Sequence, residues 1–343
     1  MARIHAARVS ASIGSEMAPI SLSDIEKAAR RLDGQVVRTP LLESAGLNAL
    51  AGCRLLVKAE SLQKTGAFKI RGALNKMMSL PEEMRAKGVV ASSSGNHGNA
   101  LAAAAKMFGV PSKIVMPADA PAMKIDNTRR HGAEIILYDR EREDRFAIVE
   151  ELARKTGMVN VPPYDDVDVM SGQGTAGIEI VEQCRATGAM PDALLVPSSG
   201  GGLSSGVIVA VKAHFPTTHC HTVEPAGFDR MARSLASGTR QRNPKSAGSI
   251  QDALTGAPIP GELTFAALSA SGATGFSVTD DEAMAAMFAL FQHLKLVVEP
   301  GGAAAVAAVL FRKGDFSGRT VVAVASGGNV DPDLFAKAIT RSR

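Results

Sequence analysis

The sequence predicts an α/β fold built on a parallel, doubly wound sheet. Short apolar stretches alternate with segments of helical spacing along most of the chain, and several of those segments end at a glycine. The 343 residues are 45% hydrophobic but only 4% aromatic, with no tryptophan. This length allows two packed domains or one large one, and this composition favours close helix–sheet layers over an aromatic-rich β sandwich.

The first half of the chain repeats the order strand then helix. It opens with a helix at residues 21–32, which has a serine or aspartate as its cap and apolar residues at helical spacing. The elements that we expect after it are strand 53–60, helix 68–80, strand 88–94, helix 99–109, strand 112–117, helix 123–132, strand 133–138 and helix 146–157.

The second half continues the same alternation with one irregular region. Residues 228–262 are expected to be rich in loops, and residues 275–294 to form a turn followed by a helix. The other expected elements are strand 192–197, a helix up to residue 216, strand 220–225, helix 301–314 and a last strand within 319–331.

Three polar loops follow strands of this pattern, and ligands of open α/β sheets bind at the carboxyl ends of strands. They are SSSGNHG at 92–98, PSSGGGLSSG at 197–206 and ASGGNVD at 325–331. In the second loop, Ser199 and the glycines 200–202 stand between a strand and a helix. Backbone N–H groups of such a turn, together with the helix N-terminus, bind anions. A phosphate is the expected guest, and a tight turn without a ligand is the alternative.

The kind of phosphate is narrowed by two nucleotide-binding patterns that this glycine turn does not match. The dinucleotide pattern G-x-G-x-x-G is not met in any register of GGGLSSG, and no G-x-x-x-x-G-K-[ST] occurs. A small phosphorylated cofactor remains. Lys69 stands between Phe68 and Ile70, apolar neighbours that favour the neutral amine that imine formation needs. A lysine together with an isolated phosphate cradle indicates pyridoxal 5′-phosphate.

The stretches GAFKIRGA, SSSGNHGNALAAAAK, VPSSGGGLSSG, VVEPGGA and VASGGNVD together resemble fold-type-II pyridoxal-phosphate enzymes. Within that family the chain looks most like threonine and serine dehydratases and serine racemases. The resemblance runs from about Ile20 to near the C-terminus. It implies two open, twisted, mostly parallel sheets flanked by helices, as in the β subunit of tryptophan synthase. It also implies assembly as a homodimer.

The resemblance also implies roles for the matching residues. Lys69 would bind the cofactor as an imine and later act as a base, and Phe68 would pack beside the ring. Asn96 would bind the phenolic oxygen, and Ser326 the pyridine nitrogen. The phosphate would be bound by Ser199, Gly200, Gly201, Gly202 and Leu203, although the family usually has glycine at the first of these positions. Glu299 is either a partner near the cofactor, which we favour, or a turn acid.

The family's substrate carboxylate pocket matches Ser93, Ser94, Gly95 and His97. In racemases of the family a serine at the position of Ser94 protonates the face opposite the lysine. We favour a simpler role, a hydrogen bond to the carboxylate, because a lone serine needs a proton network to act as an acid.

Racemase-like members carry a divalent-cation site formed by a glutamate, a backbone carbonyl and an aspartate. Glu224 and Phe228 stand at matching places in VEPAGFDRM, but Arg230 stands where the aspartate would be. A guanidinium beside a cation is unfavourable. We therefore expect no metal in the usual form, or that Arg230 replaces its charge.

The composition argues against several other classes of protein. The 38 basic residues nearly balance the 34 acidic ones, and stacking aromatics are scarce, so nucleic-acid binding is not expected. Three cysteines far apart give no disulfide or metal pattern, which favours a reduced, cytoplasmic protein. No apolar stretch is long enough for a membrane span. Residues 1–19 lack the apolar core of a secretory signal and are expected to be a disordered extension.

The sequence thus predicts a pyridoxal-phosphate lyase that deaminates a β-hydroxy amino acid such as L-threonine or L-serine. A large domain would comprise 20–86 and 168–343, and a small mobile domain 87–167. We expect no C-terminal regulatory domain, because the chain ends soon after the last motif. Racemisation of serine, or reaction with 3-hydroxyaspartate, is the alternative within enzymes. A cofactor-binding relative without catalysis is the alternative of another class, and an intact Lys69 argues against it.

Overall fold

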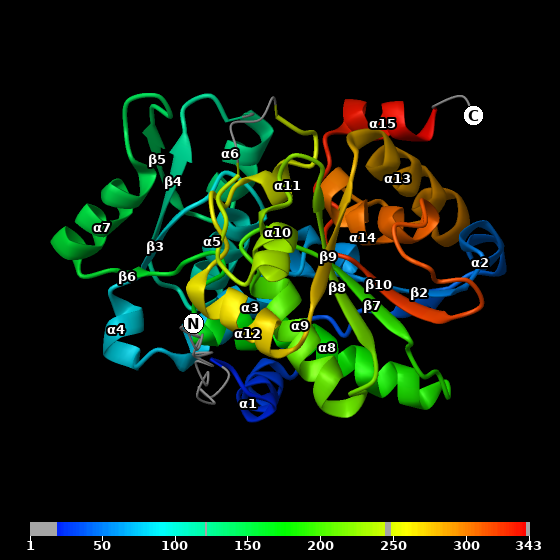
Figure 1. The fold of residues 1–343 in the computed structure, drawn as a ribbon. Helices are drawn as coiled ribbons and strands as arrows, with labels where there is room; N and C mark the ends of the chain where they lie inside the picture. The colour runs from blue at the N-terminus through cyan, green and yellow to red at the C-terminus, as the bar shows by residue number, and fades with distance from the viewer. Residues whose placement is uncertain (1–18, 121, 244–247, 341–343) are drawn as a thin grey trace, which may run out of the picture.

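The structure is a computed structural model that describes residues 19–120, 122–243 and 248–340. Its strands form two sheets, of six and of four strands, and helices cover both (Figure 1). The predicted fold class, two mostly parallel sheets flanked by helices, is confirmed. The expected extension at residues 1–19 lies outside the described residues, except for Pro19.

The six-stranded sheet has the order β1-β2-β10-β7-β8-β9, and β1 is its one antiparallel member in the described chain. Its strands are β1 (Leu41–Glu43), β2 (Arg54–Ala59), β7 (Ala193–Pro197), β8 (His219–Pro225), β9 (Thr274–Val278) and β10 (Thr320–Ala325). Alternate residues of its strands face opposite cores, as the pleat requires. In β2, Leu55 and Val57 pack with α13 (Asp280–Leu294) and α14 (Pro300–Leu310), whereas Leu56 packs with α8 (Val167–Ala186) and α9 (Gly202–His214).

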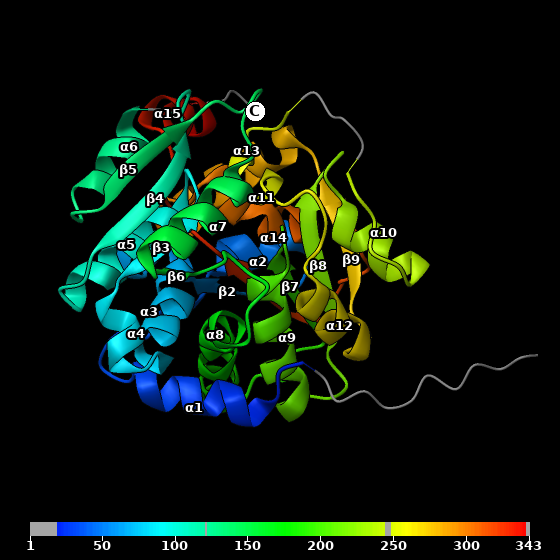
Figure 2. The same ribbon diagram turned by 90° about the vertical axis from the view of Figure 1, so that its left-hand side faces the viewer.

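The four-stranded sheet has the order β5-β4-β3-β6 and is entirely parallel. Its strands are β3 (Val89–Ser92), β4 (Ser112–Pro117), β5 (Glu134–Tyr138) and β6 (Val159–Asn160). One face packs against α3 (Lys69–Ser79) and α5 (Asn96–Met107), and the other against α7 (Arg145–Thr156). This sheet, with α6 (Ala122–Arg129) and α7, forms a separate layer beside the larger sheet (Figures 1 and 2).

The remaining helices lie at the ends of strands or on the outside of the molecule. They are α1 (Leu22–Leu32), α2 (Ala45–Ala51), η1 (Glu60–Leu62), η2 (Lys64–Gly66), α4 (Glu82–Ala86), α10 (Arg230–Ser237), α11 (Asp252–Thr255), α12 (Glu262–Ala270) and α15 (Pro332–Ile339). Helix α1 begins as predicted, because Ser21 and Asp24 form a capping box.

One expectation about an element is wrong, and another holds only in part. Residues 275–278 are part of strand β9 and not a turn, and β9 pairs with β8 along its length. The described part of the region 228–262 is rich in loops, as expected, but it also contains the short helices α10 and α11. Helix α10 was not predicted because its buried face lacks an apolar pattern: two of its three buried residues, Arg230 and Ser234, are polar.

Candidate active site

Lys69 is the first residue of α3, and the strand β10 fixes its place. The segment before it bridges to the loop after β10, between Ala67 and Gly327, and the Phe68 N–H donates to the Ser326 carbonyl (3.1 Å). The Lys69 ammonium donates to the Pro163 carbonyl (2.5 Å) and lies 5.0 Å from the centre of the Phe68 ring. Burial lowers the pKa of Lys69 from 10.5 to about 8. The amine is therefore far easier to deprotonate than a solvated lysine, as the sequence predicted from its apolar neighbours.

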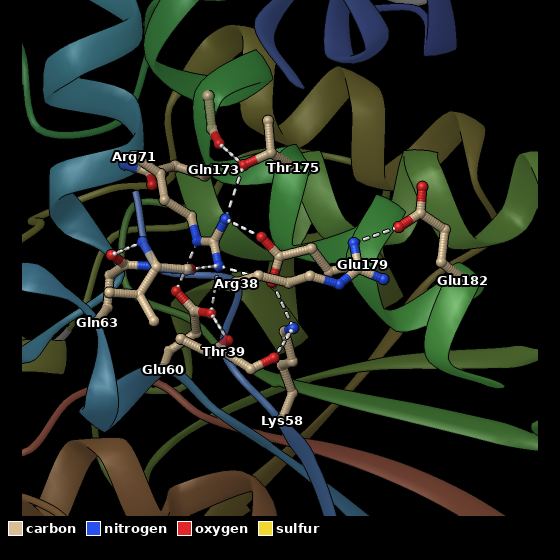
Figure 3. A network of polar contacts seen from close by, with 12 residues as sticks. Arg38, Thr39, Lys58, Glu60, Gln63, Arg71, Gln173, Thr175, Glu179 and Glu182 are labelled. Carbon is tan, nitrogen blue, oxygen red and sulfur yellow. Dashed lines mark hydrogen bonds and ion pairs between the residues drawn. The ribbon is translucent and has the colours of Figure 1, made fainter. Parts of the chain in front are cut away.

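A buried ionic network holds the first turn of α3 against α8 and the end of β2. Figure 3 shows the Arg71 guanidinium between Glu60 and Glu179, with Lys58 on the far side of Glu179. Arg71 donates twice to Glu60, both at 2.8 Å, and twice to Glu179, at 2.7 and 2.9 Å. Two cations and two carboxylates balance within the core, which is the condition under which buried charges are tolerated. Because Arg71 is two residues after Lys69, this network fixes the base of the lysine.

The glycine turn after β7 is closely packed from several sides. Gly201 has φ +102°, and a Cβ there would lie 2.7 Å from the Met231 side chain. A Cβ on Gly200 would lie 2.3 Å from the Tyr164 ring, so the ring covers that residue. The Thr264 hydroxyl donates to the Gly200 carbonyl (2.6 Å). Helix α9 then begins at Gly202 without a side-chain cap, so its first N–H groups remain available to an anion.

The loop after β3 supplies a second helix N-terminus. Helix α5 begins at Asn96, inside the stretch that we expected to be loop, and Gly95 caps it without a side-chain hydrogen bond. The Ser93 hydroxyl accepts from the Gly95 N–H (3.2 Å). His97 is buried, and its Nε2 donates to the Val161 carbonyl (2.9 Å). Burial, and after it the charge of Lys69, lowers the pKa of His97 to about 3, so the imidazole is neutral at pH 7.

Glu299 and Asn96 join this loop to the start of α14. The Asn96 amide donates to Glu299 Oε1 (2.6 Å) and accepts from the Asn329 amide (2.7 Å). Burial raises the pKa of Glu299 to about 8, with a smaller contribution from the charge of Asp252. At pH 7 this carboxyl is therefore mainly protonated. A Cβ on Gly327 would lie 2.4 Å from Glu299, which places the carboxyl directly beside the Ser326–Gly327 backbone.

These groups line one cleft of about 440 Å³. It contains every residue for which the sequence suggested a cofactor or substrate contact. They are Phe68, Lys69, Ser93, Ser94, Gly95, Asn96, His97, Ser199, Gly200, Gly201, Gly202, Leu203, Glu299 and Ser326. Lys64 does not line it; this lysine is exposed and donates to the Gln35 carbonyl (2.5 Å). Glu224, Phe228 and Arg230 also lie outside the lining.

Sequence reasoning missed part of the cleft. Tyr164 covers the glycine turn, but it stands in no stretch with a distinct pattern. Asn329 bonds to Asn96; it belongs to the predicted loop ASGGNVD, but only Ser326 of that loop was assigned a role. The cleft also contains the cations Lys124, Arg140 and Arg145. Arg145 ends the mixed charge run DREREDR at 139–145; from the sequence this run is expected to be solvated, with Arg145 as its candidate for a place near the domain cleft. No sequence signal showed that this run folds toward the segment 252–257, where the Gly256 carbonyl accepts from Arg145 (2.8 Å).

The residues present fit pyridoxal phosphate. A cleft of this size suits a small cofactor. It brings an easily deprotonated amine, Lys69, together with an uncapped helix N-terminus whose turn has no room for side chains at 200 and 201. An amine that can form an imine and a cradle for phosphate are the two features that this cofactor requires.

Comparison with known proteins agrees with this geometry. The sequence model of the family described as "Pyridoxal-phosphate dependent enzyme" matches residues 32–327. The L-threo-3-hydroxyaspartate ammonia-lyase of Saccharomyces cerevisiae is 40% identical over 92% of this chain and 95% of its own length. The L-threonine ammonia-lyase of Thermotoga maritima is 40% identical over 94% of this chain and 79% of its own length.

The fold has close counterparts among solved structures. The structure of maize serine racemase superposes with a TM-score of 0.86 at 36% identity, covering 94% of this chain and 97% of that one. The resemblance drawn from the sequence motifs is therefore confirmed. The chain belongs to the family of pyridoxal-phosphate dependent enzymes, within its fold-type-II group.

Proposed function

We propose that this protein is an ammonia-lyase that converts a β-hydroxy amino acid, L-threonine or L-serine, to a 2-oxo acid and ammonia. The observation that carries this proposal is Lys69, an amine of lowered pKa in the same cleft as the glycine turn and the loop 92–98. Relatives of 40% identity with ammonia-lyase names support the class of reaction.

The residues that would hold the cofactor come from four segments of the cleft. Lys69 would bind it covalently, and Ser199 and the glycines 200–202 would bind the phosphate, at the uncapped start of α9. Asn96 and Ser326 would contact the ring. When bound, the cofactor supplies an electron sink that makes the α-proton of the amino acid acidic.

The other steps fall to side chains of this chain. Lys69 is the base that takes the α-proton, and its lowered pKa lets the neutral amine form near neutral pH. The substrate carboxylate is bound at the uncapped N-terminus of α5, beside Ser93, Ser94 and Gly95. Neutral His97 adds no charge there and fills the floor of this pocket.

We infer two domains with the boundaries expected from the sequence, 20–86 plus 168–343 and 87–167. Two contacts join the smaller unit to the segment 252–257 on the other side of the cleft. Lys124 pairs with Asp252, and Arg145 donates to the Gly256 carbonyl. Both are exposed polar contacts of modest strength, which suits a small domain that opens for substrate and closes over it.

A second candidate substrate is 3-hydroxyaspartate, and the charge of the cleft favours it. Lys124 and Arg140 are paired, with Asp252 and Asp119. Within the described part of the chain no carboxylate pairs with Arg145, although this arginine lines the cleft. A guanidinium free of carboxylates is suited to a second carboxylate on the β-carbon of the substrate. Threonine and serine offer no such group.

One experiment distinguishes the candidates. The purified holoenzyme is supplied with L-threonine, L-serine, D-serine and L-threo-3-hydroxyaspartate, and 2-oxo acid release and the chirality of the remaining substrate are followed. A higher kcat/KM for the dicarboxylate, lost in Arg145→Met but not in the matched control Arg142→Met, would name 3-hydroxyaspartate. If Arg145→Met changed kcat/KM equally for all substrates, L-threonine and L-serine would remain the proposed substrates. Inversion without 2-oxo acid would make the protein a racemase.

We also infer a cytoplasmic homodimer. Cys53, Cys184 and Cys220 are free and buried, and burial raises their pKa values, for Cys184 to about 11 and for Cys220 to about 12. Such thiols suit a reducing compartment but do not require one. In the described part of the chain, no helix could span a membrane. Sedimentation of the holoenzyme tests the dimer.

A further inference from the structure

Arg230 is a fully buried arginine placed just behind the phosphate turn. It is the first residue of α10, and its side chain is 0% exposed. An arginine is almost never buried to this degree without a partner for its charge. Its nearest carboxylate is Glu224, also fully buried, but the closest N–O distance is 3.8 Å, too long for a hydrogen bond. An ordinary salt bridge therefore does not explain its position.

Oxygen atoms from three other segments surround the guanidinium. Nη1 donates to the Phe228 carbonyl (2.8 Å), and Nη2 donates to the Ser199 hydroxyl and the Leu254 carbonyl (both 2.7 Å). With Glu224 this makes a set of two carbonyls, one hydroxyl and one carboxylate. Oxygen sets of this kind are what hard divalent cations take as ligands. Here the cation is covalently part of the chain, so a metal ion does not fit among these residues.

Two of these contacts lead directly to the cofactor cleft. Ser199 immediately precedes the three glycines of the phosphate turn, and Leu254 belongs to α11, whose residues line the same cleft. The guanidinium thus ties two parts of the cleft wall together from behind. It also places a fixed positive charge next to the turn, hydrogen-bonded to Ser199, which stands where the family usually has glycine.

We propose that Arg230 is a built-in cation that holds the phosphate turn in its binding geometry, so that cofactor binding needs no divalent ion at this place. Arg230 is a positioning residue and not a catalytic one, since it does not line the cleft in which substrate and cofactor would bind. The proposal rests on the cofactor family and is independent of which amino acid is the substrate.

The test measures cofactor affinity, by titration of the apoenzyme, and thermal stability, each in EDTA and with millimolar Mg²⁺ or Ca²⁺. For the wild type we expect no response to metal. Arg230→Met should weaken cofactor binding about ten- to a hundredfold, as expected for lost charged hydrogen bonds, with no recovery on adding metal. Arg230→Asp should be equally weak in EDTA but recover affinity with Mg²⁺ or Ca²⁺, because it supplies a carboxylate in place of the tethered cation.

Two further variants keep the test decisive. Arg233→Met removes a half-exposed arginine from the same helix and should bind cofactor like the wild type. Arg230→Lys keeps the positive charge but loses the planar guanidinium with its several donors. Its cofactor affinity should therefore lie between those of the wild type and Arg230→Met. Loss of wild-type affinity in EDTA with recovery in metal would overturn the proposal. The proposal would also be overturned if Arg230→Met bound cofactor as tightly as the wild type, or if metal did not change the cofactor affinity of Arg230→Asp. The EDTA comparison on the wild type needs no variant to fold.

Discussion

Removing the Arg71 side chain should destabilise the protein strongly, although the residue does not reach the cleft. In Arg71→Met, Glu60 and Glu179 lose four charged hydrogen bonds in the core, and Lys58 alone remains to balance two carboxylates. Breaking a buried ionic network by removing one partner typically costs about 3–5 kcal/mol. We expect this loss in the free energy of unfolding.

The corresponding change in Tm follows from the size of the chain. At about 2.1 cal/mol/K per residue, 343 residues give an unfolding entropy of about 0.7 kcal/mol/K. The Tm of Arg71→Met should then fall by about 4–7 °C in scanning calorimetry. The matched control is Arg38→Met, which removes the exposed Arg38–Glu182 pair of Figure 3 and should change stability by no more than about 1 kcal/mol.

The effect should also depend on pH. Burial by itself would raise the pKa of Glu60, but the charges and hydrogen bonds of Arg71 and Lys58 keep it below its usual 4.5. The wild type therefore has this stabilisation above pH 4.5 and loses it as the pH falls further. The Tm difference between Arg71→Met and the wild type should shrink over that range. Equal Tm values for Arg71→Met and Arg38→Met at pH 7 would refute the role given to the network.

Three further predictions concern the cleft. Lys69 of the apoenzyme should react with an acylating reagent with a midpoint near pH 8, against about 10.5 in the denatured protein, as read by peptide mass spectrometry; the same midpoint in both states would contradict its desolvation. Gly201→Ala should lower the free energy of unfolding by about 2–4 kcal/mol and weaken cofactor binding, because Gly201 has a φ of +102° and an added Cβ would contact Met231. The control Gly238→Ala has open space around it, so it should lower the free energy of unfolding by about 1–2 kcal/mol and leave cofactor affinity unchanged. Ser94→Ala should raise KM about tenfold with a smaller change in kcat; loss of racemisation alone would instead make Ser94 an acid.

The sequence was sufficient for the position of the site because of a simple rule of parallel sheets. The loops after β3, β7 and β10 all leave the carboxyl ends of strands, and the structure brings them into one cleft. Lys69 was identified by its neighbours Phe68 and Ile70, and its local environment is indeed desolvating. These features are local, so a linear reading can find them.

Other features depend on contacts between distant segments. Arg71 and Glu179 are 108 positions apart, and Arg230 and Ser199 are 31 apart, so no local pattern links them. The long helix α8 was not predicted at all. It contains Gly172, Gly174 and Gly177, which usually weaken a helix. The structure explains these glycines by close packing, since a Cβ on Gly172 would lie 2.7 Å from the α3 backbone.

The central claim is that Lys69 is the catalytic lysine of an ammonia-lyase. The most direct test is 2-oxo acid release from L-threonine, L-serine and L-threo-3-hydroxyaspartate by cofactor-loaded wild type, Lys69→Ala and Lys64→Ala. We predict turnover of at least one substrate by the wild type and by Lys64→Ala, and none by Lys69→Ala. Undiminished turnover in Lys69→Ala, or no 2-oxo acid from the loaded wild type with any of the three, would contradict the account.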